Sequence, residues 1–137
     1  MLAGWRASTV DVDLRIEPES DEVMRQVAGL KERLRTNIEF ASPADFLPEL
    51  PGWRERSPFR FRAGSAEVFD YDLYSQALAK IERGFDTDLA DVEAMLSQGL
   101  VDPRQLRELF TAIEPELFRF PAVDVAAFHR KLEAAVP

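Results

Sequence analysis

The segment GWRASTVDVDL, residues 4–14, decides how the rest of the chain is interpreted. Its second part alternates Val10 and Val12 with Asp11 and Asp13, and this period of two predicts a β-strand. Residues i and i+2 of a strand project from the same face, so we expect the two carboxylates to lie side by side. Two such charges repel each other unless a cation neutralises them. The segment therefore raises the question of what the aspartates bind.

A hard divalent cation such as Mg²⁺ binds carboxylates together with water and phosphate oxygens, which makes Asp11 and Asp13 candidate metal ligands. A solvent-facing strand with Arg15 as counter-charge is the alternative, since short motifs often match by chance. A third acid, Glu39, lies in the predicted strand NIEFA, residues 37–41. If the two strands are neighbours, Glu39 joins the pair and supplies the three ligands that two-metal phosphoryl transfer needs. A solvated strand face is again the alternative.

The pattern up to residue 71 mixes helix and strand. Val23, Val27 and Leu30 form a helical stripe that follows Ser20 as N-cap, and Ser42 begins a short second helix. The Pro-rich stretch LPELPGWRERSP is expected to be a loop. After it, FRFRA and AEVFD, separated by Gly-Ser, predict a β-hairpin.

The pattern from residue 72 onward is helical only. Asp72 is the expected N-cap of a helix that ends at Gly84, and Asp88 is the expected start of one that ends at Gly99. Asp102 followed by Pro103 begins a third helix, and Val125, Phe128 and Leu132 mark a fourth.

These patterns together predict an α+β fold in a single domain, residues 1–137. A small mixed β-sheet occupies residues 1–71, and a helical portion follows over residues 72–137. The first strand has little chain before it to pair with, so we expect either an upstream unit or a partner at its edge.

The composition narrows the function classes. The chain has 137 residues, no cysteine and a formal net charge of −8. The absence of cysteine excludes disulfides and thiolate chemistry, and it suits a reducing cytoplasm. An acidic chain has no general attraction for nucleic acid, although Arg54, Arg56, Arg60 and Arg62 form a local basic stretch that a polyanion could contact. No stretch resembles a secretory signal or a membrane span.

Three stretches carry a resemblance to a known family: GWRASTVDVDL, NIEFASPADFLPELPGW and QALAKIERGFDTDLADVEAML. They look like nucleotidyltransferase-like proteins of the DNA polymerase β superfamily. Near relatives of that family are the minimal nucleotidyltransferases and the abortive-infection nucleotidyltransferase toxins. The resemblance spans almost the whole chain. It implies transfer of a nucleotidyl group from a nucleoside triphosphate (NTP) with Mg²⁺ or Mn²⁺.

The resemblance also implies roles for the residues of the strand motif. Asp11 and Asp13 match the metal-binding pair of the family, and Glu39 matches its third acidic residue by position. Arg6 and either Ser8 or Thr9 match the residues just before the pair, and Arg6 and Thr9 are our candidates for nucleotide binding.

A second motif of the family, K-x-x-R followed by D-x-x-D, is matched by Lys80, Arg83, Asp88 and Asp91. Lys80 resembles a triphosphate contact, and Asp88 resembles a catalytic or structural acid. The spacing agrees, because Lys80 and Arg83 at i and i+3 share a helix face and could bind phosphate oxygens. A salt-bridged helix face is the alternative for the cations, and helix capping is the alternative for the aspartates.

The family also places a glycine-serine element and a first strand before the D-x-D strand, and that element holds phosphates at a helix N-terminus. The sequence MLAGWRAS resembles only the tail of that helix, so we expect the element to be missing here.

Two hypotheses follow from the sequence. The first is a metal-dependent nucleotidyltransferase with a protein, RNA or small-molecule acceptor. The second is a non-catalytic interaction module, such as a toxin–antitoxin component or a homodimer. The missing glycine-serine element favours the second hypothesis, whereas the joint presence of Asp11, Asp13, Glu39 and Lys80 favours the first.

Overall fold

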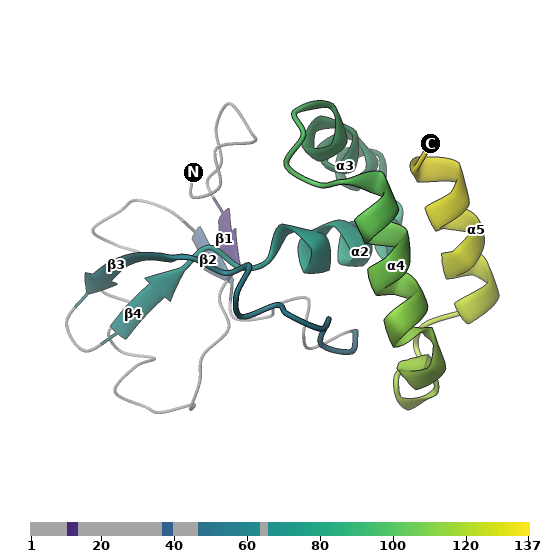
Figure 1. Cartoon of the computed structure of the whole chain (residues 1–137), viewed down its shortest axis with the longest axis horizontal. Coiled ribbons are helices and arrows are strands. Elements are labelled where there is room, and N and C mark those ends of the chain that lie inside the picture. Colours follow the sequence, from purple (N-terminus) through teal and green to yellow (C-terminus); the bar gives the residue numbers. More distant parts are fainter. Residues whose placement is uncertain (1–10, 14–36, 40–46, 64–65) are drawn as a thin grey trace.

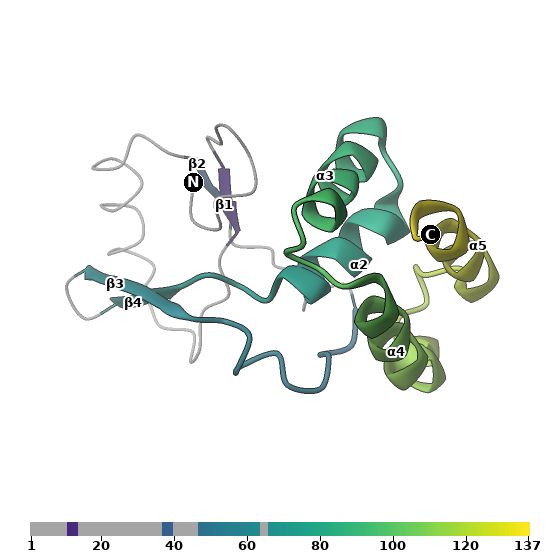
Figure 2. The same ribbon diagram turned by 45° about the horizontal axis from the view of Figure 1, so that its top comes forward.

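A computed structural model describes residues 11–13, 37–39, 47–63 and 66–137 of the chain (Figure 1). Its main body consists of four α-helices and a short 3₁₀ helix. In chain order they are α2 (Leu73–Arg83), α3 (Asp86–Ser97), α4 (Pro103–Ile113), η2 (Glu114–Arg119) and α5 (Val125–Ala135). Helix α2 lies in the middle of this body and packs against α3, α4 and α5 (Figure 2).

The hydrophobic core lies among these helices. Ala77, Leu78 and Ile81 form the buried stripe of α2 and are fully inaccessible to solvent. Phe110 of α4 packs edge to face on Phe128 of α5, with ring centroids 4.9 Å apart. Such aromatic pairs add to the free energy gained by burying apolar surface. The core therefore fixes α2 rigidly, and with it every polar side chain that α2 carries.

Local signals in the sequence correctly predicted both ends of α2 and the start of α4, whereas no cap was predicted for α5. The side chains of Asp72, Asp102 and Asp124 accept hydrogen bonds from backbone amides in the first turns of α2, α4 and α5. Gly84 ends α2 in the left-handed conformation, with φ of 73°, which favours glycine. These caps satisfy backbone groups that have no partner inside the helix.

Helix α3 begins earlier than predicted. It starts at Asp86 after Phe85, whose side chain makes no capping bond, so Asp88 is the third helical residue and not the cap. Asp88 lies in the first turn of α3, near the start of the helix as predicted, but its alternative role as the N-cap is wrong. The reason is that Asp88 is held by side chains of α2 and does not cap the amides of its own helix.

The strands are short and lie outside the helical body. β1 (Asp11–Asp13) pairs in parallel with β2 (Asn37–Glu39), while β3 (Phe59–Ala63) pairs antiparallel with β4 (Ala66–Phe69). The β3–β4 pairing confirms the predicted hairpin, and Figures 1 and 2 show that it points away from the helices. The two helices predicted after Ser20 and Ser42 lie outside the described residues.

The prediction of an α+β fold with a small mixed β-sheet was wrong, because the part of the chain that the structure describes is predominantly helical. In that part the strands form two separate two-stranded ladders and no common sheet. Strands of three to five residues in isolated pairs are marginally stable, whereas the helices bury continuous apolar stripes. An alternating pattern predicts a strand but does not decide whether strands join into one sheet. The assignment of residues 1–137 to one domain, with its two portions meeting at residue 72, stays a prediction.

The segment before β3 belongs to the helical body. Leu47 and Leu50 are buried in the same core cluster as the helices, although they precede α2 by more than twenty residues. Among the helices of the described part, none is long and apolar enough to cross a membrane.

Candidate functional site

The pairing of β1 with β2 brings the sequence positions of the predicted metal ligands together. Asp13 is the register partner of Glu39, and Asp11 is the register partner of Asn37. Neighbouring strands lie about 4.8 Å apart, so the backbones of the three acids occupy adjacent positions of one ladder. The condition for Glu39 to join the aspartate pair, that the strands be neighbours, is therefore met. The structure describes the backbone pairing of these strands and not their side chains, so the convergence of the three carboxylates stays a prediction.

Two other predicted residues, Arg6 and Thr9, lie outside the described residues. Within residues 47–63 and 66–137, no group of three histidine, aspartate or glutamate side chains is placed to hold a metal ion. The donor type of the strand acids Asp11, Asp13 and Glu39 fits Mg²⁺, which prefers carboxylate oxygens, so their role as metal ligands stays a prediction.

The second predicted motif forms a compact set of ion pairs between α2 and α3, which we name the α2–α3 charge cluster. It consists of Lys80, Arg83, Asp88 and Asp91. Arg83 donates to both carboxylate oxygens of Asp88, from Nη2 at 2.7 Å and from Nε at 3.3 Å. Lys80 Nζ donates to Asp91 Oδ2 at 2.9 Å and lies 4.0 Å from Asp88 Oδ1.

Burial differs among the four side chains of the cluster. The side chain of Asp88 is 7% exposed, those of Lys80 and Asp91 are 13% and 15% exposed, and that of Arg83 is 52% exposed. Asp88 is also in the first turn of α3, where a negative charge is favoured by the helix dipole. The cluster has two cations and two anions and is therefore electrically balanced.

The geometry unites the residues of the predicted motif but gives them partners within the protein. Lys80 and Arg83 do share a helix face, as their spacing predicts, and both approach the same oxygen of Asp88. This arrangement matches the salt-bridged alternative for these cations. Binding of phosphate by Lys80 and Arg83 stays a prediction, as does a catalytic role of Asp88.

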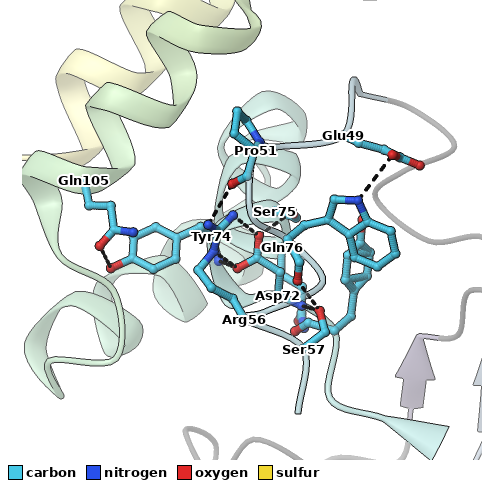
Figure 3. A network of polar contacts seen from close by, with 11 residues as sticks. Glu49, Pro51, Arg56, Ser57, Asp72, Tyr74, Ser75, Gln76 and Gln105 are labelled. Atoms are coloured by element: carbon cyan, nitrogen blue, oxygen red, sulfur yellow. Dashed lines mark hydrogen bonds and ion pairs between the residues drawn. The ribbon is translucent and has the colours of Figure 1, made fainter. Parts of the chain in front are cut away.

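A second polar network, which sequence reasoning missed, ties the loop before β3 to the start of α2 (Figure 3). We name it the Asp72 network. Arg56 forms a bidentate pair with Asp72, from Nε to Oδ1 at 2.9 Å and from Nη2 to Oδ2 at 2.7 Å. Its Nη1 donates to the carbonyl oxygen of Pro51 at 2.8 Å. Such fork-shaped pairs are among the strongest hydrogen bonds in proteins.

Each of the two carboxylate oxygens of Asp72 accepts hydrogen bonds from two donors. Oδ1 also accepts from the backbone N–H of Tyr74, and Oδ2 accepts from the Ser75 hydroxyl. The backbone N–H of Asp72 in turn donates to Ser57 Oγ, and that hydroxyl donates to the carbonyl of Trp53. A carboxylate that is fully buried, as this one is, requires such complete pairing.

The electrostatic consequence is visible on the cation. The hydrogen bond to Asp72 raises the pKa of Arg56 above its ordinary value; burial opposes this, and the charge of Asp72 adds to it. Arg56 also lies over the ring of Tyr74, 5.4 Å from its centroid. The Tyr74 hydroxyl bonds to Gln105 Oε1 at 3.1 Å and accepts from the backbone N–H of Asp102, which connects α2 to the start of α4. The network therefore stabilises the fold at the N-terminus of α2.

Comparison of the chain with protein-family models, with curated proteins and with solved structures finds no match.

Proposed function

We propose that the chain is a metal-dependent nucleotidyltransferase, which moves a nucleotidyl group from an NTP to a hydroxyl group of a protein, an RNA or a small molecule. The observation that carries the proposal is the register of β1 and β2, in which Asp13 is paired with Glu39 and Asp11 lies two residues earlier on the same strand. Two short parallel strands thus gather three acids at adjacent backbone positions, as a carboxylate metal site requires.

The reaction assigns roles to the strand acids and to the residues expected near the nucleotide. Asp11, Asp13 and Glu39 would hold Mg²⁺ or Mn²⁺, which would neutralise the triphosphate and make the α-phosphorus more electrophilic. The acceptor oxygen forms a bond to the α-phosphorus, the bond to pyrophosphate breaks, and the hydroxyl proton passes to a base. Glu39 either completes the metal site or acts as that base. Lys80 and Arg83 orient the triphosphate, with Arg6 and Thr9 near the nucleotide.

The test is calorimetric titration of the protein with each of the four NTPs in the presence of Mg²⁺. Wild type should bind at least one NTP with a Kd below the millimolar range. Asp11→Asn/Asp13→Asn should weaken that binding about tenfold or more, because it removes two negative ligands. The matched control is Asp86→Asn/Glu93→Gln, which removes the same charge from exposed positions of α3 and should bind as wild type does.

If wild type binds no NTP at millimolar concentration, or if both double variants bind equally well, the proposal is wrong. Labelled NTP incubated with RNA, with protein or with small hydroxyl compounds then identifies the acceptor class.

A second candidate function is the non-catalytic interaction module. The observation in its favour is the α2–α3 charge cluster, in which Lys80 and Arg83 are already paired with Asp91 and Asp88. This candidate predicts no metal-dependent NTP binding in the titration above. It also predicts a stable assembly, as a homodimer or with a protein partner, which light scattering after size exclusion measures.

A further inference from the structure

Lys80 is enclosed by carboxylates in a way that bears on how it could bind a phosphate chain. Its ammonium nitrogen lies 2.9 Å from Asp91 Oδ2 and 4.0 Å from Asp88 Oδ1, and the side chain is 13% exposed. A lysine that contacts a triphosphate must present the same ammonium group to the phosphate oxygens. Asp91 therefore occupies a direction from which an anion would approach.

The α2–α3 charge cluster consists of two pairs of different kinds. Both oxygens of Asp88 accept hydrogen bonds from Arg83, and Asp88 is the more deeply buried acid. Asp91, one turn further along α3, pairs with Lys80. Release of Asp91 from Lys80 would leave the bidentate pair of Arg83 and Asp88 in place, and with it the connection between the two helices.

We propose that Asp91 competes with the phosphate chain of the nucleotide for Lys80 and thereby keeps metal-free polyphosphate weakly bound. This inference rests on the proposed function, in which Lys80 orients the triphosphate. Two anions beside one cation repel each other strongly where solvent is largely excluded. The phosphate chain gains Lys80 only when Asp91 turns away.

The test uses inorganic tripolyphosphate without metal, which isolates the phosphate contacts from base recognition and from the strand acids. Asp91→Asn should bind tripolyphosphate about tenfold more tightly than wild type in calorimetric titration. Glu93→Gln is the matched control, because it removes one charge from an exposed position of the same helix. It should change the affinity less than about twofold, the long-range effect of one screened charge. Asp91→Glu retains the competitor and should bind as wild type does.

The increase in tripolyphosphate affinity should depend on Lys80, so the double variant Asp91→Asn/Lys80→Met should not show it. If Asp91→Asn stays within twofold of wild type, or if the gain survives Lys80→Met, the inference is overturned. Urea unfolding checks that each variant is folded, and Asp91→Ser replaces Asp91→Asn, with the same expected gain, if the latter is not. If the wild type binds no NTP in the presence of Mg²⁺, the proposed function is overturned. This outcome is separate from the tripolyphosphate titration, which contains no metal.

Discussion

Helix α2 carries an ion-pair network at each end, and the two networks differ in how completely their charges are enclosed. At the N-terminus, the Asp72 side chain is fully buried and its two oxygens accept four hydrogen bonds. At the C-terminus, the α2–α3 charge cluster divides two acids between two cations, and Arg83 is half exposed. A fully paired buried network fixes one conformation, whereas partly exposed pairs can exchange partners at lower cost. The comparison separates one end of α2, where the acid is fully enclosed, from the other end, where one cation is half exposed.

The largest effect is expected at the enclosed end. Asp72→Ala removes the helix cap and leaves Arg56 without its bidentate partner, so we expect a loss of about 3 kcal/mol in the free energy of unfolding. Urea denaturation measures this value. A matched capping variant, Asp124→Ala at the N-cap of α5, loses only a cap bond and should cost about 1 kcal/mol. Equal costs for the two variants would show that the Arg56 pair adds nothing.

These two networks show what the sequence could and could not predict. The caps at Asp72, Asp102 and Gly84 were predicted because capping depends on residues within one turn. The Asp72 network was missed because its ion pair spans 16 residues, and nothing local distinguishes Arg56 from the other arginines of its stretch. The sequence holds only a weak signal for this pair. A buried capping aspartate needs a cation, but the preceding stretch offers four arginines, and nothing in the sequence selects one of them.

The same limit explains the outcome for the candidate site and for the sheet. The period of two predicted β1, β2 and the hairpin correctly, since it depends on successive residues. Whether strands assemble into one layer depends on contacts between distant segments, and the expected mixed sheet was wrong for that reason. The residues of the K-x-x-R and D-x-x-D pattern lie on the neighbouring helices α2 and α3, but their spacing could not show that Lys80 and Asp91 would pair with each other.

The second largest effect is expected at the buried acid of the other end. Asp88→Ala removes both hydrogen bonds to Arg83 and the negative charge near the start of α3. Hydrogen bonds to charged groups contribute about 1.5–3 kcal/mol, and the exposure of Arg83 reduces the expected loss to about 2 kcal/mol. Urea unfolding of this variant beside Asp72→Ala tests the comparison directly. A loss larger than that of Asp72→Ala would reverse the ranking of the two ends.

A smaller change in the free energy of unfolding is expected when the planar guanidinium of Arg56 is replaced by an ammonium group. Arg56→Lys keeps the charge but cannot make two parallel bonds to Asp72, and we expect a cost of about 1 kcal/mol. The raised pKa of Arg56 fixes the pH dependence of the wild-type pair. A cation with a raised pKa in the folded state contributes its full stability below its unfolded pKa, and that stability is lost only as the pH rises through the folded value.

The pKa of an unfolded arginine already lies well above the working pH range, so the contribution of Arg56 should be constant over that range. The difference in urea midpoint between wild type and Arg56→Lys should therefore not change between about pH 6 and pH 9. A difference that varies across this range would mean that another titrating group controls the Asp72 network.

The smallest effect is expected for Arg83→Ala, because half of this side chain is exposed to solvent and water screens its charge. We expect a loss of about 0.5 kcal/mol in low salt and a smaller loss at about 1 M salt, where the Debye length is near 3 Å. Arg104→Ala is the matched control, because Arg104 pairs with Glu108 on one exposed helix face and should lose still less. Since Lys80 remains beside Asp88, the acid is not left alone in this variant, unlike Arg56 in Asp72→Ala. If Arg83→Ala lowered the free energy of unfolding as much as Asp72→Ala, the two networks would stabilise the fold equally. The α2–α3 charge cluster would then not be the more weakly held of the two.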